Sequence, residues 1–382
     1  MKEIKVVIAV DSFKGSASSK EVAESIEKGI KKFGRSNIVT KKVSIADGGE
    51  GTVEAIVEAV NGEYKFVEVS GPFGDKVKAR FGVIRGNTAV LEMAESSGLN
   101  LVKRENLNPY KANTYGVGEM LKAILDMGIR DIYIGLGGSA TNDGGAGMLS
   151  SLGVKFYNLN GERIGYTPEE LKNIVKVDIS RLDPRISEAQ ITVLSDVSNP
   201  LYGINGASYI YGPQKGATPQ DVKILDKILE NYGNIIDNTV GKNFSEKPGS
   251  GAAGGLGYAL MSVCGAEFKE GIVKIMELIE LENLIKDADL VITGEGRIDN
   301  QSVNGKAPVG IAKMAKKYNI PVIAIVGSST RNLDDIYANG IDLVMDIINE
   351  PMKLERAIHD VKELLEFAGE KAMRAFFLRG DY

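Results

Sequence analysis

The chain has 382 residues, of which 43% are hydrophobic and 25% are charged, a composition that is typical of an ordinary globular protein. Its formal net charge is -5, and the sequence contains no block of lysines and arginines, so we expect neither a nucleic-acid partner nor an anionic membrane surface. The length exceeds what one hydrophobic core usually organises, which predicts two domains.

The first residues do not resemble a targeting signal. The apolar run Lys5–Val10 is too short for the hydrophobic region of a signal peptide, and it stops at Asp11 rather than at a small-residue cleavage site. No uninterrupted apolar stretch reaches the length of a membrane span. We therefore expect a cytoplasmic protein with no membrane partner. The oligomeric state is left open between a monomer and a homodimer.

Cysteine and histidine are too rare to carry the chemistry. The single cysteine, Cys264, excludes an internal disulfide and a cysteine-rich metal site, and its apolar surroundings predict a small core residue. The single histidine, His359, stands in a charged pattern near the carboxy terminus, where a solvated residue is expected. A Ser-His-Asp hydrolase and a histidine-ligated zinc enzyme are therefore disfavoured. Catalysis must use carboxylates, lysines, arginines, hydroxyls and backbone amides.

The chain begins with a strand–loop–helix pattern. Lys5–Val10 predicts a buried strand, and Ser18 with Glu21 has the spacing of a capping box before an amphipathic run that ends at Lys32. A second strand at Ile38–Ser44 leads into a glycine-rich loop and another helix. Two consecutive strands thus deliver charged loops to one sheet edge, and in open α/β sheets that carboxyl edge is where ligands bind.

The pattern changes in the middle of the chain and returns at the end. Residues 76–84 and 88–93 alternate like an antiparallel hairpin around a turn at 85–87, which does not belong in a simple doubly wound sheet. From Asp289 alternating strands and helices return. Alternating strands and helices at both ends, with a different middle, predict an α/β domain that is interrupted by an insert beginning near residue 70.

A glycine-rich segment, 131–148, organises the middle of the chain. A short apolar run ends in Gly135-Leu-Gly137-Gly138, continues as Ser139-Ala-Thr-Asn-Asp143, and enters a small-residue helix start. Glycines let backbone amides approach a ligand, and a helix start offers unpaired donors, so the expected guest is a phosphate. A structural turn is the alternative. The G-x-G-x-x-A pattern is also compatible with a nicotinamide-dinucleotide site, but the acidic residue expected about twenty residues later is missing. No Walker A motif is present.

Several other loops place a charged residue after a strand or before a helix. Each has an ordinary interpretation: Lys14 as a solvated lysine, Asp47 as a helix cap, Asp196 as a turn residue, and Arg297 with Asp299 as a surface pair. Together they supply what phosphoryl transfer needs, namely cations and amides around the phosphates, carboxylates for Mg²⁺, and one acceptor for a hydroxyl proton.

At this point the chain resembles the type I glycerate kinase family. The similarity extends over essentially the whole chain, with its motifs in the same order. Small departures occur at Ala17-Ser18 and at Asn300-Gln-Ser302, and neither removes a chargeable group. The motifs that carry the resemblance are Asp11-Ser-Phe-Lys14-Gly-Ser16, Ala46-Asp47-Gly-Gly-Glu50-Gly-Thr52, Gly135–Gly145, Asp196-Val-Ser-Asn199-Pro-Leu201, Gly212-Pro-Gln-Lys215-Gly216, Gly251–Gly257, and Thr293-Gly-Glu295-Gly-Arg297-Ile-Asp299 followed by Gly305-Lys306-Ala-Pro308.

The resemblance implies phosphorylation of D-glycerate that depends on ATP and Mg²⁺. The favoured product is 2-phosphoglycerate, and 3-phosphoglycerate is the alternative. It also implies an α/β protein with two dissimilar domains and the active site in the cleft between them. We expect these to be a discontinuous Rossmann/flavodoxin-like parallel-sheet domain (1–70 and 286–382) and an inserted mixed α/β domain (71–285), in agreement with the interrupted domain inferred above. A non-catalytic sensor of a small phosphorylated acid stays a second hypothesis, and an NAD-dependent oxidoreductase is a weaker one.

We assign roles within this mechanism as hypotheses. Asp47 or Asp196 accepts the hydroxyl proton, and Lys14 and Arg297 neutralise the transferring phosphoryl group and the substrate carboxylate. Further candidates fall into three groups. The amides expected to hold the nucleotide phosphates are those of Gly137, Gly138, Ser139, Ala140 and Thr141; the metal ligands expected are Asp143 and Asp299; the substrate-binding residues expected are Ser12, Glu50, Asn199 and Lys306.

Overall fold

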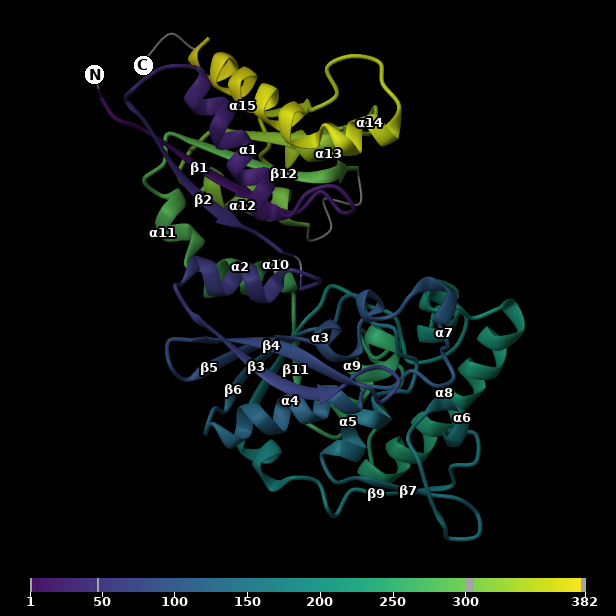
Figure 1. Cartoon of the computed structure of the whole chain (residues 1–382). Helices are drawn as coiled ribbons and strands as arrows, with labels where there is room; N and C mark the ends of the chain where they lie inside the picture. Colours follow the sequence, from purple (N-terminus) through teal and green to yellow (C-terminus); the bar gives the residue numbers. More distant parts are fainter. Residues whose placement is uncertain (1, 47, 300–305, 379–382) are drawn as a thin grey trace. The chain divides into compact units, whose positions relative to one another are not determined.

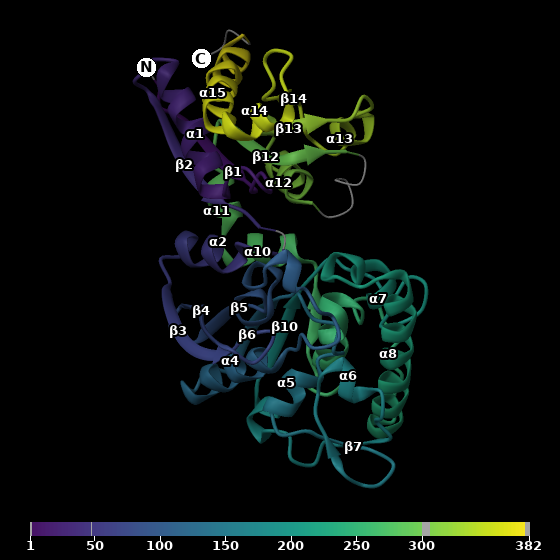
Figure 2. The same ribbon diagram turned by 45° about the vertical axis from the view of Figure 1, so that its right-hand side comes forward.

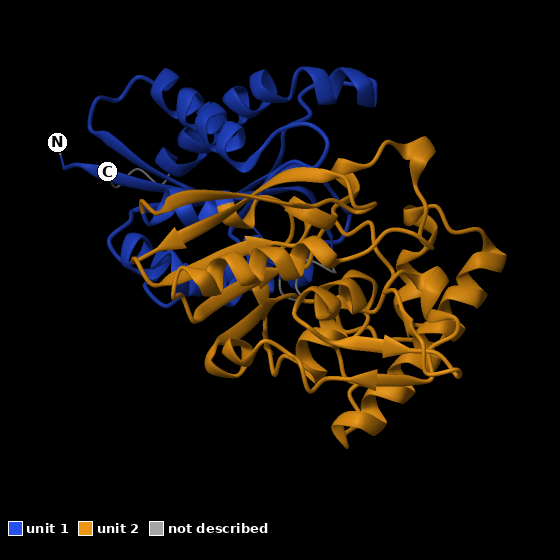
Figure 3. Cartoon of the chain, turned by 60° about the horizontal axis from the view of Figure 1, so that its bottom comes forward, with its two compact units in different colours: residues 1–47, 54–60, 272–382 blue, residues 48–53, 61–271 orange. Residues whose placement is uncertain are grey.

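The computed structural model describes residues 2–46, 48–299 and 306–378. The chain divides into two compact units, coloured separately in Figure 3: unit 1 comprises residues 1–47, 54–60 and 272–382, and unit 2 comprises residues 48–53 and 61–271. The predicted fold class, α/β with a discontinuous parallel-sheet domain and an inserted mixed domain, is confirmed by this architecture.

Unit 1 is built on a five-stranded sheet in which every neighbouring pair is parallel. The strand order is β14-β13-β12-β1-β2, which is the flavodoxin-like order once the insert is ignored. The direction of progression across the sheet reverses between β1 and β12. The strands are β1 Ile4–Val10, β2 Ile38–Ser44, β12 Leu290–Ile298, β13 Val322–Ser329 and β14 Leu343–Asp346.

Helices cover both faces of this sheet. On one face α1 (Ser19–Lys32) and α15 (Val361–Phe377) lie side by side, and α12 (Ala307–Lys316) lies on the other face (Figure 2). The α1–α15 approach is close because Gly29 and Gly369 leave no room for a side chain against the opposing backbone. The remaining helices are α2 Thr52–Ala59, which runs across the division between the units, α10 Gly271–Leu278, α11 Leu281–Ile285, α13 Asp334–Ala338 and α14 Leu354–His359.

The β1 sequence explains why the strand is central. Ile4, Val6, Ile8 and Val10 face the core under α1 and α15, whereas Val7 is buried outside that cluster. A strand with apolar side chains on both faces can be covered by helices on both, which suits a parallel sheet. At the start of α1 the predicted capping box is confirmed, with Ser18 and Glu21 exchanging hydrogen bonds.

Unit 2 contains a six-stranded mixed sheet of order β11-β10-β6-β5-β4-β3 and a small antiparallel sheet of order β8-β7-β9 (Figure 1). The predicted hairpin is confirmed as β4 and β5, and Arg85 and Gly86 take positive φ in its turn. The strands are β3 Glu63–Ser70, β4 Lys76–Ile84, β5 Thr88–Glu92, β6 Asp131–Gly135, β7 Lys155–Tyr157, β8 Arg163–Ile164, β9 Lys176–Asp178, β10 Gln190–Leu194 and β11 Glu267–Lys269.

The longest helix of unit 2, α8 (Pro219–Val240), starts as its sequence indicates, with Thr218 as the cap, Pro219 in the first turn and Asp221 completing a capping box. The other helices are α3 Ala94–Ser97, α4 Tyr115–Asp126, α5 Ala146–Ser151, α6 Pro168–Leu171, α7 Ala207–Tyr211 and α9 Leu256–Ser262.

The compact units differ from the predicted domains at residues 48–53 and 61–70, which belong to unit 2, and at residues 272–285, which belong to unit 1. The sequence placed β3 in the discontinuous domain, which was expected to end at residue 70. In the structure β3 pairs along its whole length with β4, as a hairpin around Gly71–Asp75, and it therefore belongs to the sheet of unit 2.

Candidate functional site

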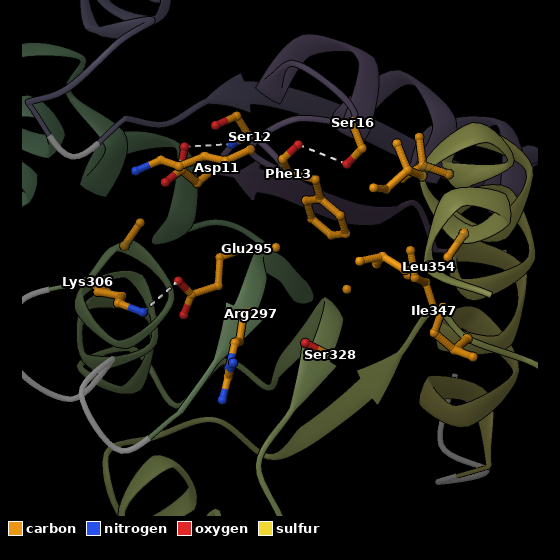
Figure 4. Close-up of a pocket in the computed structure, with 18 of the residues that line it drawn as sticks. Asp11, Ser12, Phe13, Ser16, Glu295, Arg297, Lys306, Ser328, Ile347 and Leu354 are labelled. Atoms are coloured by element: carbon orange, nitrogen blue, oxygen red, sulfur yellow. Dashed lines mark hydrogen bonds and ion pairs between the residues drawn. The ribbon is translucent and has the colours of Figure 1, made fainter. Parts of the chain in front are cut away.

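A cavity of about 700 Å³ opens in unit 1, at the carboxyl ends of β1 and β12 (Figure 4). These are the two strands between which the strand order reverses, and ligands of open α/β sheets bind at this point. The predicted residues Ser12, Lys14, Arg297 and Lys306 therefore lie around one cavity. Its polar lining is Asp11, Ser12, Lys14, Ser16, Glu295, Arg297, Lys306 and Ser328.

The loop after β1 forms one side of the cavity. Its start is fixed to β12, since the Asp11 N–H donates to the Gly294 carbonyl at 3.0 Å. Its turn is closed by the Ser16 hydroxyl, which donates to the Phe13 carbonyl at 2.9 Å, while the Phe13 ring is buried. These contacts leave Lys14 exposed at the tip of a loop whose two ends are both held.

β12 and the residue before α12 supply opposite charges. The Lys306 Nζ atom lies 3.3 Å from Glu295 Oε2 and 3.8 Å from Asp299 Oδ1. Arg297 Nε lies 3.9 Å from Asp299 Oδ2, and the Arg297 side chain is 70% exposed. The Glu295 carboxylate is far more buried, with 11% of its side chain exposed. Glu295 was not among the residues predicted for the site, although its place inside the Thr-Gly-Glu-Gly-Arg motif was a usable signal.

The opposite side of the cavity is apolar. Ile347 and Leu354 lie away from Lys306 and Glu295, with Phe13 between the two sides, so the cavity has a charged end and a hydrophobic end (Figure 4). Six of the apolar residues that line it, called the apolar wall below, are Phe13, Ile347, Ile348, Met352, Leu354 and Ile358.

In unit 2 two of the predicted glycine-rich loops pack backbone against backbone. A Cβ on Gly137 would lie 2.5 Å from the Gly49 Cα, and a Cβ on Gly135 would lie 2.7 Å from the Gly48 carbonyl oxygen. Gly48 is equally close to the end of β10, where a Cβ would meet the Leu194 carbonyl oxygen at 2.5 Å. Only glycine permits this approach, which brings the 48–51 loop to the carboxyl ends of β6 and β10.

A buried carboxylate holds this loop. Glu92, at the end of β5, accepts hydrogen bonds from the backbone N–H groups of Val53 (2.7 Å) and Gly51 (3.3 Å). Burial raises the pKa of Glu92 to about 7, and the two amide donors partly oppose that rise. Sequence reasoning missed this residue, because a glutamate at the end of a strand carries no signal that it is buried.

The predicted acidic groups of this edge have different surroundings. Asp196 is exposed after β10, and its Oδ1 accepts from the Gly271 N–H at 2.9 Å. Glu50 is exposed in the loop that Glu92 holds. Asp47 lies outside the described residues. The amide of Asn199, a predicted substrate contact, is used within the protein: its Nδ2 donates to Asn205 and its Oδ1 accepts from Tyr211.

The predicted phosphate cradle, Gly137–Thr141, is accessible only at its start. Gly138 is exposed, but the chain is buried from Ser139 onward. The Ala140 N–H is already used, since it donates to the Ser97 carbonyl at 2.9 Å. The Thr141 carbonyl accepts from Lys215 Nζ at 2.7 Å. The loop therefore does not present an open row of amides, and its buried part is fixed by contacts within unit 2.

Asp143 has a structural environment that argues against its predicted role as a metal ligand. The side chain is completely buried, and Oδ2 accepts from the Thr114 N–H and hydroxyl, both at 2.8 Å, and from the Gly147 N–H at 3.1 Å. Oδ1 accepts from the Gly145 N–H at 3.1 Å. Burial raises the pKa of Asp143. Because protein donors surround both oxygens, the carboxylate joins α4 to the start of α5 and is not available to a cation.

Lys215, in the Gly-Pro-Gln-Lys-Gly motif, is also fully buried in this region. Burial lowers its pKa to about 7, and the negative charge of Asp143 opposes that shift. Its contact with Thr141 ties the end of the glycine-rich loop to the segment before α8. Lys215 therefore has a structural role. From the sequence alone, a lysine in such a glycine-containing motif would suggest an anion-binding site.

The fit of a divalent cation can be judged from the carboxylates. In the described part of the chain, no three or more His, Cys, Asp or Glu side chains converge as a preformed metal site. Mg²⁺ is commonly held by one or two carboxylates together with phosphate oxygens, so a preformed cage is not required. Asp11 and Glu295 line the unit 1 cavity and fit this arrangement, with Asp299 beside Lys306.

Across the ranges given above, no helix is both long and apolar enough to cross a membrane.

Comparison with known proteins identifies a family for this chain. The model of the glycerate kinase family matches residues 6–377. A glycerate kinase of Halalkalibacterium halodurans is 46% identical over 95% of this chain and 96% of its own length. A glycerate 2-kinase of Escherichia coli K12 is 47% identical over 93% of each chain.

A solved structure shows the same fold. The crystal structure of a protein named as a glycerate kinase 2 candidate, from Salmonella typhimurium LT2, matches with a TM-score of 0.86 and 42% identity over 100% of both chains. With the family match from residue 6 to residue 377, this shows that the chain belongs to the glycerate kinase family.

Proposed function

We propose that this protein transfers the γ-phosphoryl group of ATP to D-glycerate and forms 2-phosphoglycerate. The observation that carries the proposal is the charged end of the unit 1 cavity, where Lys14, Arg297 and Lys306 line the same space as Asp11 and Glu295. The names of the relatives support glycerate as the substrate, and the name of the Escherichia coli relative, glycerate 2-kinase, supports the 2-hydroxyl as the acceptor.

The cations explain how the chain would bind and activate the phosphates. Lys14 lies at the tip of a loop that is fixed at both ends, and Arg297 projects from the end of a central strand. Charges held on such a frame stabilise the charge of the transition state without having to reorganise. Arg297 can in addition contact two oxygens of a phosphate or a carboxylate, because its guanidinium group is planar.

The acidic residues have two roles. Mg²⁺, bound to the nucleotide phosphates, would bring positive charge to their oxygens, and Asp11 and Glu295 are the residues that would hold it. A different carboxylate must accept the proton of the hydroxyl group. We assign this step to Asp196 or to Asp47, the two alternatives that the sequence left open.

The proposed step balances as a direct transfer. The hydroxyl oxygen of glycerate forms a bond to the γ-phosphorus while the bond from that phosphorus to the bridging oxygen of ADP breaks, and the hydroxyl proton passes to the carboxylate base. Because a hydroxyl is a weak acid, proton transfer occurs late, and most of the acceleration comes from alignment and charge.

The test is glycerate-dependent release of ADP. Purified protein is incubated with ATP and Mg²⁺, with and without D-glycerate, and ADP is measured with a coupled assay. Phosphorus NMR of the product then separates 2-phosphoglycerate from 3-phosphoglycerate. Release of ADP only when glycerate is present supports the kinase. Binding of ATP without any turnover would instead support the non-catalytic sensor.

A further inference from the structure

We propose that the apolar wall of the unit 1 cavity binds the adenine ring of ATP, so that base and phosphates both lie in unit 1. This inference rests on the proposed kinase function and specifies where its nucleotide binds. It also moves the nucleotide away from the Gly137–Thr141 loop, which the sequence favoured for the phosphates.

The size of the cavity does not match glycerate alone. A volume of about 700 Å³ falls within the range of pockets that enclose a drug-sized ligand, whereas glycerate is a small acid in which every carbon carries a hydroxyl group or belongs to the carboxylate. The charged end of the cavity could bind the polar groups of glycerate, but the apolar end could not. A ligand that fills the cavity must have a charged part and a flat hydrophobic part, and a nucleotide has both.

The apolar wall itself is incompletely covered by the protein. Ile348 is 40% exposed, Ile358 is 42% exposed and Leu354 is 71% exposed, and all three line the cavity. Leaving such apolar side chains in water is unfavourable. Burial against an aromatic ring would recover part of this free energy. Phe13, which is buried at the end of β1, would offer the ring an aromatic neighbour.

The two ends of the cavity are joined through one loop. Phe13 belongs to the wall and Lys14, the next residue, belongs to the charged end. In Figure 4 the ring of Phe13 lies between the Glu295 side of the cavity and Leu354. A nucleotide whose base meets Phe13 would therefore direct its phosphates toward Lys14 and Lys306. This direction agrees with ligand binding at the reversal point between β1 and β12.

The glycine-rich loop of unit 2 offers less for a nucleotide. The Ala140 amide and the Thr141 carbonyl already have protein partners, and Ser139, Ala140 and Thr141 are buried. The segment also packs on the 48–51 loop through Gly137, which accounts for this glycine without a phosphate. The features that made the loop a phosphate candidate are thus explained by packing.

The test separates binding of the base from binding of the phosphates. Ile358→Glu places a charge in the wall, and Ile224→Glu is the matched control, because Ile224 lies on α8 with a similar exposure of 46%. Dissociation constants are measured by calorimetry for ADP and for inorganic tripolyphosphate. Ile358→Glu should raise the dissociation constant of ADP about tenfold or more, because the isoleucine side chain would no longer make an apolar contact with the adenine ring. The dissociation constant of tripolyphosphate should not change. Ile224→Glu should change neither.

A second variant tests the same contact by fluorescence, without requiring that the affinity for ADP change. The sequence contains no tryptophan, so Leu354→Trp gives a protein with a single tryptophan in the wall. Its fluorescence should change when ADP is added and should not change with tripolyphosphate. The inference is overturned if Ile358→Glu weakens neither ligand, if it weakens both equally, or if the tryptophan does not respond to ADP. Any of these results, with glycerate-dependent ADP release intact, leaves the kinase proposal standing; loss of that release in the wild-type protein overturns the kinase proposal itself.

Discussion

The buried carboxylate of Glu92 accepts a hydrogen bond of 2.7 Å from the backbone N–H of Val53, thirty-nine residues earlier in the chain. A second bond from Gly51 means that one side chain fixes the loop that carries Glu50 and follows Asp47. Glu92 touches no proposed reacting group, so we regard it as a positioning residue. Its contact also connects the strand β5 to a segment that the sequence alone assigns to a different domain.

The first prediction concerns pH and Glu92. Its pKa rises from an ordinary value of 4.5 to about 7 on folding, mainly because burial disfavours the ionised form. The stabilisation that comes from the protonated form is complete below about pH 4.5 and is lost as the pH rises through about 7. Glu92→Gln cannot ionise, so its free energy of unfolding, relative to that of the wild type, should increase by up to about 3 kcal/mol between pH 4.5 and pH 8.

Chemical denaturation at several pH values measures this difference. The control is Glu68→Gln, an exposed glutamate on β3 of the same sheet, which should follow the wild type at every pH. If the free energies of unfolding of Glu92→Gln and of the wild type differ by a constant amount across this range, the carboxyl group of Glu92 does not have the raised pKa that its burial indicates.

Local signals account for what could be predicted. Ser18 with Glu21, and Thr218 with Asp221, are capping pairs within one helical turn, and both helices begin where the sequence indicates. The hairpin of β4 and β5 is equally local. The interruption of one domain by an insert followed from the return of the alternating strand–helix pattern near the carboxy terminus. Each of these features can be recognised from patterns within short stretches of the sequence.

Long-range burial accounts for what could not be predicted. Nothing near Asp143 in the sequence reveals that Thr114 would enclose it, and nothing near Glu92 reveals Val53. A glycine that binds a phosphate and a glycine that lets two loops touch also look alike in a sequence; Gly137 is of the second kind. The apolar wall was missed for the same reason, since Met352 and Ile358 look like ordinary helix-core residues.

The second prediction separates the structural role of Asp143 from a metal role. In Asp143→Asn an NH₂ group replaces an acceptor among four N–H and O–H donors, so the free energy of unfolding should fall by about 1–3 kcal/mol. The Mg²⁺ concentration that gives half-maximal activity should not change in the protein that remains folded.

Asp75→Asn, at an exposed position in the same unit, is the control for stability. A variant with wild-type stability and a strongly raised Mg²⁺ requirement would restore Asp143 as a metal ligand.

The third prediction concerns Lys215 and has the opposite pH dependence to that of Glu92. Burial lowers the pKa of this lysine from 10.5 to about 7, so folding favours its neutral form. The resulting stabilisation is complete above about pH 10.5 and is lost as the pH falls toward 7. The stability of the wild type, relative to that of Lys215→Met, should therefore increase by up to about 1.4 kcal/mol per pH unit above pH 7.

Denaturation at pH 7, 8 and 9 tests this slope. Lys223→Met, on the exposed face of α8, removes the same charge from water and should leave the slope unchanged. A constant stability difference between Lys215→Met and the wild type would show that Lys215 is charged in the folded protein throughout this range.

The fourth prediction concerns the proton acceptor. Asp196 is exposed, and its Oδ1 contact with the Gly271 N–H can be kept by the Oδ1 atom of an asparagine. Asp196→Asn should therefore fold normally, with an unchanged melting temperature. If Asp196 accepts the hydroxyl proton, kcat should fall by about two to four orders of magnitude, because the amide cannot take up the proton. The KM for glycerate should change much less than kcat, since the base acts in the transition state and not in binding.

Asp47→Asn, measured in parallel, decides between the two candidates. A large fall in kcat for one variant and wild-type turnover for the other identifies the base. Comparable falls in both would mean that one carboxylate positions the substrate while the other accepts the proton, and the pH profile of kcat then distinguishes them, because only loss of the base removes the acidic limb of that profile. Wild-type turnover in both variants would remove Asp47 and Asp196 from the mechanism, and it would leave the carboxylates of the unit 1 cavity, Asp11 and Glu295, as the groups to test next.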